Sequence, residues 1–93
     1  MIHAFVLIDA QPDAITDLSM AIVELDGVRE THSVAGGECD LVAVLAVADH
    51  ESIARVVTDG IAKLEGVAGT RTMIAFRSYS ASDLDAGYEG FGD

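Results

Sequence analysis

The residues best suited to binding another molecule lie in one short turn and on one later strand of the predicted structure. Residues 35–40 read AGGECD, and Thr70 and Thr72 are spaced so that both hydroxyls share one face of a strand. Glycines let the backbone approach another molecule closely, the carboxylates of Glu38 and Asp40 attract cations, and hydroxyls bond anionic groups. These residue types fit noncovalent binding of a small molecule that carries a positive and a negative group.

The same residues also have a purely structural interpretation. Two glycines complete a hairpin, Asp40 bonds its own turn, and the two threonines are good strand formers. Both interpretations stay open at the level of the sequence.

Other reactive side chains form no recognisable catalytic or metal-binding pattern. His3, His32 and His50 lack a ligand spacing such as i, i+4 with a companion carboxylate, and Cys39 is the only cysteine. We therefore expect no enzyme, no metal and no cofactor. Arg71 and Arg77 share one side of the last strand, where they could pair with the acidic tail of another subunit, bind an anion, or form a solvated or salt-bridged surface.

The composition describes one small, acidic and unusually hydrophobic domain. The 93 residues are 51% hydrophobic, and their formal net charge is −11, with 16 acidic and 5 basic residues. Such a charge repels a phosphate backbone, so we expect no direct binding to nucleic acid. Acidic residues interrupt every apolar run before the about 18 residues that suggest a membrane span, and no signal peptide precedes them, so we expect a cytoplasmic protein.

Hydrophobic periodicity predicts four strands and two helices. Short runs that are apolar on both faces indicate buried strands, and apolar residues three and four apart indicate helices. The predicted order is a strand at residues 2–8, a helix at 12–26, an edge strand at 28–34, a central strand at 41–47, a helix at 49–65 and a strand at 67–77.

An internal repeat fixes how these elements combine. Residues 25–34 recur as residues 64–73, and both segments place a helix-ending glycine before a strand. Two β-α-β units with right-handed crossovers give an α+β, ferredoxin-like βαββαβ fold, with an antiparallel four-stranded sheet and both helices on one face. The other face is apolar as well, so we expect a second copy to cover it, as in dimeric α/β barrels.

Two segments carry a resemblance to a known family. Residues 34–41 read VAGGECDL and residues 64–72 read LEGVAGTRT. They resemble the glycine-x-x-aspartate and glycine-valine-x-x-threonine-x-threonine patterns of the effector-binding (RAM) domain of Lrp/AsnC transcription regulators, over about residues 2–80. Cys39 departs from the aromatic residue that family members often have at this place.

The resemblance implies a homodimer with facing sheets, assembly up to an octamer of four dimers, and a small effector, usually an amino acid, bound between dimers. The family's ligand-binding site then falls on Gly37, Glu38, Asp40, Thr70 and Thr72. An amino acid would place its ammonium group near the carboxylates and its carboxylate near hydroxyls or backbone N–H groups.

The resemblance also implies a role in transcription regulation. The chain begins directly with a strand, so it is similar to stand-alone members without a helix-turn-helix domain, and a full-length Lrp/AsnC regulator would read DNA for it. We expect residues 1–80 to form the ligand-binding and oligomerisation domain and residues 81–93 an acidic tail.

Two other functions stay open as alternatives. A small ferredoxin-like barrel enzyme, of the monooxygenase or isomerase type, would need an acid-base pair or a cavity of haem size. A ligand-free oligomeric scaffold would need neither.

Overall fold

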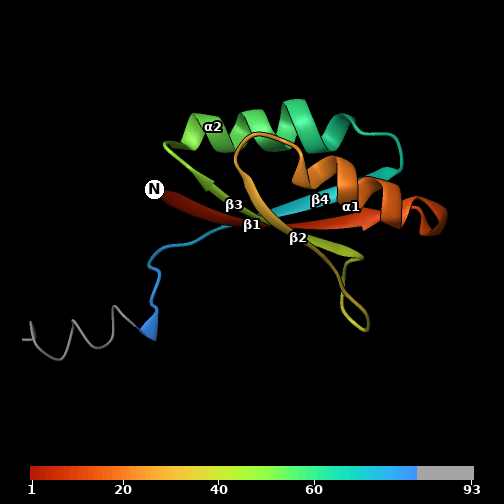
Figure 1. The fold of residues 1–93 in the computed structure, drawn as a ribbon, viewed down its shortest axis with the longest axis horizontal. Helices are drawn as coiled ribbons and strands as arrows, with labels where there is room; N and C mark the ends of the chain where they lie inside the picture. Colours follow the sequence, from red (N-terminus) through yellow and green to blue (C-terminus); the bar gives the residue numbers. More distant parts are fainter. Residues whose placement is uncertain (82–93) are drawn as a thin grey trace, which may run out of the picture.

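A four-stranded antiparallel sheet carries the helices of residues 12–63 on one face (Figure 1). The structure is a computed structural model that describes residues 1–81. The strands lie in the order β2-β3-β1-β4, which confirms the predicted ferredoxin-like fold and the edge position of the second strand. The elements are β1 (Ile2–Ala10), η1 (Pro12–Ala14), α1 (Ile15–Val23), β2 (Val28–Ser33), β3 (Leu41–Val47), α2 (His50–Ala54), η2 (Arg55–Gly60), η3 (Ile61–Lys63) and β4 (Val67–Ile74). The predicted tail lies outside the described residues from position 82 onward.

The hydrophobic core fills the space between the sheet and the helices. Alternate residues of the two central strands face the helices and are fully buried: Ala4, Val6, Ile8, Leu41, Ala43 and Leu45. The helical side of this core consists of Leu18, Ile22, Ile53, Val56 and Ile61. Because side chains alternate across a strand, the residues between them, such as Phe5, Leu7, Val42 and Val44, face away from the helices.

The internal repeat corresponds to two matching turns between a helical segment and a strand. Gly27 has φ +96° and Gly66 has φ +100°, a left-handed conformation that favours glycine. A Cβ at Gly27 would lie 2.9 Å from Val47 Cγ1, and one at Gly66 would lie 2.7 Å from Ala14 Cβ. Both the backbone conformation and the lack of space therefore require glycine at these two positions.

The second helical region is less regular than the single helix predicted for it. Asp49 caps it as expected, since Asp49 Oδ1 accepts hydrogen bonds from the Ser52 N–H at 2.8 Å and the Ser52 hydroxyl at 2.7 Å. The α-helical part ends at Ala54, and a π-helical segment and a 3₁₀ turn follow. Gly60, with φ −108° and ψ −81°, lies where the π segment ends, which gives a local reason for the irregularity.

The centre of the sheet face away from the helices is apolar, and no element within residues 1–81 covers it. Phe5 of β1 lies opposite Val44 of β3 and Met73 of β4 on this face, and Leu7 lies opposite Val42. Phe5 is 37% exposed and Met73 is 53% exposed. We call this surface the open face. No helix within residues 1–81 has the length and hydrophobicity needed to cross a membrane.

Candidate functional site

The turn between β2 and β3, residues 34–40, extends away from the helices at one end of the sheet (Figure 1). A hydrogen bond from the Val34 N–H to the Asp40 carbonyl oxygen, 3.0 Å long, closes its base. Gly36 has φ +77°, and a Cβ built at Gly36 or Gly37 would meet no atom within 4 Å. The backbone of this turn is therefore open to close approach by another molecule.

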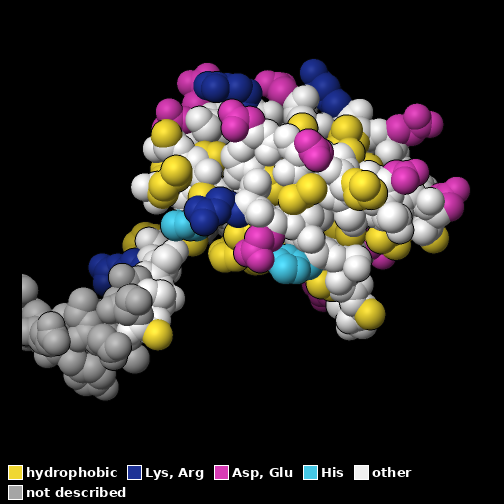
Figure 2. Space-filling model, in the orientation of Figure 1, with side chains coloured by type: hydrophobic (Ala, Val, Ile, Leu, Met, Phe, Trp, Pro, Cys, Tyr) yellow, Lys and Arg dark blue, Asp and Glu magenta, His cyan; other side chains and the backbone are white. Residues whose placement is uncertain are grey.

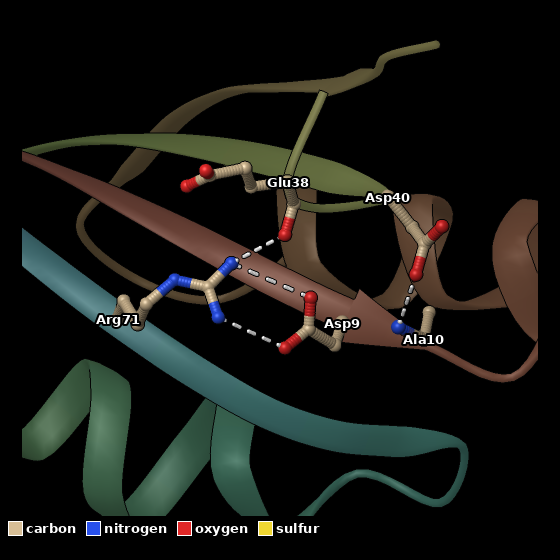
Figure 3. A network of polar contacts seen from close by, with 5 residues as sticks. All are labelled: Asp9, Ala10, Glu38, Asp40 and Arg71. Atoms are coloured by element: carbon tan, nitrogen blue, oxygen red, sulfur yellow. Dashed lines mark hydrogen bonds and ion pairs between the residues drawn. The ribbon is translucent and has the colours of Figure 1, made fainter. Parts of the chain in front are cut away.

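Asp40 ties the turn to the end of β1. Its Oδ2 atom accepts a hydrogen bond from the Ala10 N–H at 2.8 Å (Figure 3), and its own N–H donates to the Ile8 carbonyl oxygen at 2.9 Å. The Asp40 side chain thus stabilises the neighbouring strand rather than its own turn. Its second carboxylate oxygen makes no hydrogen bond within residues 1–81, so it keeps capacity for a cationic group.

Arg71 of β4 connects three segments of the chain (Figure 3). Its Nη1 atom lies 3.1 Å from Asp9 Oδ2, and its Nη2 atom lies 3.5 Å from Asp9 Oδ1. Nη2 also donates to the backbone carbonyl oxygen of Glu38 at 2.6 Å. Of the interpretations left open for Arg71, the structure contains the salt bridge, and adds a bond to the turn.

Thr70 and Thr72 do not join this cluster within one chain. They pair with Ile8 and Val6 of β1, whose side chains face the helices, so the two threonines lie on the helical side of the sheet. Arg71, between them in sequence, lies on the other side. Neither threonine hydroxyl has a hydrogen-bond partner among the described residues. Gly37, Glu38 and Asp40 share the turn, although the carboxylates of Glu38 and Asp40 point apart (Figure 3), and the threonines lie across β1 from them.

Asp9 is the member of this region that the sequence did not single out. It follows the apolar part of β1 and pairs with Gly69, two positions before Arg71. Diagonal neighbours in adjacent strands are close enough for long side chains to meet. The register of β1 against β4 is the signal that could have identified the ion pair between Asp9 and Arg71.

The remaining reactive side chains are scattered. Residues 1–81 contain no group of three or more His, Cys, Asp or Glu that could hold a metal ion, and Cys39 is a free thiol. On the exposed edge strand, the Nε2 atom of His32 lies 3.4 Å from the Oε1 atom of Glu30. A cleft of about 440 Å³ lies apart from the turn, and it is lined by residues that include Leu25, Gly27, Val47, Arg55 and Asp59.

The fold and this turn define a ligand-binding domain of the type found in Lrp/AsnC transcription regulators. Residues 3–84 match the family described as "Lrp/AsnC ligand binding domain", and the chain belongs to this family. The resemblance seen in the two glycine-containing segments is thereby confirmed.

Several relatives and solved structures are similar to the chain. An HTH-type transcriptional regulator of Pyrococcus horikoshii, PH1916, is 40% identical over 76 residues, which cover 78% of this chain and 50% of the relative. The chain thus spans about half the length of this relative. The crystal structure of TTHA0845 from Thermus thermophilus is 48% identical, with a TM-score of 0.81, and the match covers 86% of this chain and 99% of that one.

More distant structures share the fold alone. The transcriptional regulator NMB0573 of Neisseria meningitidis, solved as a complex with L-Met, is 18% identical, with a TM-score of 0.75, over 87% of this chain and 55% of the regulator. The matched part, about half of that regulator, therefore has the same architecture as the present chain.

Proposed function

We propose that this domain binds a small amino-acid effector at the turn of residues 34–40 and transmits its presence through the assembly of subunits. The observation that most supports this proposal is the open Gly36-Gly37 backbone beside two carboxylates, Glu38 and Asp40, in a chain of a ligand-binding family. The exposed Glu38 carboxylate and the unbonded Asp40 oxygen attract the ammonium group of an amino acid. Backbone N–H groups of the turn suit its carboxylate.

Thr70 and Thr72 enter this site through another subunit. Their hydroxyls face the helical side of the sheet, whereas the turn extends to the opposite side. Within a single chain the threonines and the turn are therefore apart. A site between subunits, of the kind that the family resemblance implies, brings the threonines of one subunit to the turn of another. The complex of NMB0573 with L-Met gives a precedent for an amino acid bound by a protein of this fold.

The open face supports a homodimer. A contiguous apolar surface on a small domain usually marks an interface, and a second copy offers the same surface by two-fold symmetry. Phe5, Leu7, Val42, Val44 and Met73 supply hydrophobic contacts from three adjacent strands. The two sheets then pack face to face, and further dimers associate around the turns.

DNA recognition belongs to another domain or protein in this proposal. Figure 2 shows acidic side chains scattered over the visible surface and a smaller number of Lys and Arg side chains. With a formal net charge of −11, the domain repels DNA and controls a DNA-binding regulator by joining its assembly. It is a regulatory binding domain and performs no catalysis.

The proposal is tested by thermal unfolding in the presence of each standard L-amino acid, together with light scattering to measure subunit number. Binding to the folded state raises the unfolding midpoint by linkage, so one or a few amino acids should raise it in a concentration-dependent way. If no amino acid changes the midpoint of a well-folded dimer, the domain is a ligand-free scaffold instead.

A further inference from the structure

Arg71 holds the candidate turn from a different strand. Its Nη2 atom donates to the Glu38 carbonyl oxygen at 2.6 Å, while both terminal nitrogens contact the Asp9 carboxylate. The guanidinium group is planar and its donors have fixed directions, so a contact with Asp9 also fixes the direction of the donor that reaches Glu38. Asp9 and Arg71 together therefore form a rigid support for one peptide group of the turn.

That peptide group joins Glu38 to Cys39. No peptide bond of the described chain is cis, and in a planar trans peptide the C=O and N–H bonds point in opposite directions. When the Glu38 carbonyl oxygen is held toward Arg71, the Cys39 N–H must point away from Arg71. This N–H has no hydrogen-bond acceptor within residues 1–81. The direction of the Cys39 N–H is therefore set by the hydrogen bond that Arg71 makes on the opposite side of the same peptide group.

We infer that Arg71 is a positioning residue of the effector site, which orients the Cys39 N–H toward an anionic group, of the carboxylate class, on the bound molecule. This inference rests on the proposed function and adds a residue outside the turn to it. Arg71 does not touch the bound molecule in this account. It acts through the Glu38–Cys39 peptide and through the order of the turn.

Stability of the fold is a poor alternative explanation for the contact. The Arg71 and Asp9 side chains are 49% and 39% exposed, and ion pairs with such exposure contribute little to folding. Residues 35–39, between the hydrogen-bonded ends of the turn, make no hydrogen bond within residues 1–81 other than the one from Arg71, and a Cβ at Gly36 or Gly37 would meet no atom within 4 Å. Loss of Arg71 should therefore loosen residues 36–39 and leave the sheet and its interface intact.

The experiment compares wild-type protein with the variants Arg71→Ala and Arg71→Lys, and with Arg77→Ala as the matched control. Arg77 follows the same strand, but its guanidinium lies over the Phe76 ring and makes no contact with the turn. Backbone order parameters from ¹⁵N relaxation report on residues 36–39 without any bound molecule. Calorimetric titration with each standard L-amino acid then measures affinity, and light scattering verifies the subunit number.

We expect Arg71→Ala to lower the order parameters of residues 36–39 toward the flexible range below about 0.6. We expect it to weaken amino-acid binding by about tenfold or more, as the loss of a hydrogen bond to a charged group implies. Arg71→Lys keeps the charge without the two-pronged geometry and should give an intermediate result. Arg77→Ala should match the wild type.

An ordered turn in Arg71→Ala, or unchanged amino-acid affinity, overturns the inference. If Arg71→Ala fails to fold, Arg71→Lys decides by the same two measurements. If the wild type binds no amino acid, the proposed function fails, and the role assigned to the Cys39 N–H fails with it. The relaxation data still decide separately whether Arg71 fixes the turn.

Discussion

Asp40 accepts a hydrogen bond from the backbone N–H of Ala10 across 2.8 Å, and this bond joins the candidate effector turn to the end of β1. One oxygen of the Asp40 carboxylate thus supports the fold, and the other is available to a bound cation. The two roles can be separated by the choice of substitution.

Asp40→Asn should preserve the fold and abolish the amino-acid response. The amide oxygen of asparagine can still accept from Ala10, but the negative charge that attracts an ammonium group is lost. Asp40→Ala should also lower the free energy of unfolding by about 1–3 kcal/mol, because it leaves the partly buried Ala10 N–H without an acceptor. Urea unfolding and calorimetric titration of both variants check these expectations. Wild-type affinity in a folded Asp40→Asn variant would show that the charge has no part in binding.

The open face predicts an effect on subunit number from a single exposed residue. Met73→Arg should dissociate the proposed dimer, since it places a charge among the apolar side chains opposite Phe5. Met20→Arg is the matched control, because Met20 is 65% exposed on α1, in the helical layer away from the open face. Light scattering should give monomers for Met73→Arg and dimers or larger assemblies for Met20→Arg. Equal assembly of both variants would place the interface elsewhere.

Two glycines should respond differently to the same substitution. Gly66→Ala should lower the free energy of unfolding by about 2 kcal/mol, because φ is +100° and the new Cβ would lie 2.7 Å from Ala14 Cβ. Gly37 has neither restraint, so Gly37→Ala should fold normally and instead weaken amino-acid binding by obstructing the turn. Urea unfolding curves and amino-acid titrations of both variants test this difference. Wild-type affinity in Gly37→Ala would contradict the role of the turn in binding.

One buried hydroxyl should oppose folding. Within residues 1–81, Thr31 Oγ1 is buried without a hydrogen-bond partner, beside the buried Ala43 of β3. Thr31→Val keeps the branched shape and removes this unpaired polar group, so the free energy of unfolding should rise by about 1 kcal/mol. Thr31→Ser keeps the hydroxyl, loses a methyl group and should be destabilising. A loss of stability in Thr31→Val would indicate that the hydroxyl has a partner, such as water or a second subunit.

The cap of α2 predicts part of the pH dependence of stability. Hydrogen bonds from the Ser52 hydroxyl and then from the Ser52 N–H hold the pKa of Asp49 below its ordinary value of 3.8. Because the folded-state pKa is the lower one, this stabilisation is present above the ordinary value and is lost as pH falls through the folded-state pKa. Asparagine also caps helices but does not titrate. The stability difference between wild type and Asp49→Asn should therefore change only in that acidic range, and a constant difference would contradict the assignment.

Much of this architecture was predictable because it depends on local sequence. The apolar runs of β1 and β3 gave the central strands, and the repeated glycines at positions 27 and 66 gave the two matching turns. The irregular second helix was not predicted, because it depends on the conformation taken at Gly60. The contacts of Arg71 were not predicted either, since they require the register of β1 against β4 together with the path of a distant turn.

The candidate site shows the same division. Glycine and carboxylate residues identified the turn, and the threonine spacing correctly placed Thr70 and Thr72 on one side of their strand. The pairing of these threonines with Val6 and Ile8 was needed to show that they face the helices. The separation of the two threonines from the turn within one chain was therefore not predicted. Binding at any of these residues remains a prediction.

The most direct test of the account is to map amide chemical-shift changes while titrating the amino acid that most raises the unfolding midpoint. We predict that the largest changes occur at residues 36–40, with smaller changes at Thr70 and Thr72. Changes confined to the cleft lined by Gly27, Val47 and Arg55, with the turn unaffected, would contradict the account.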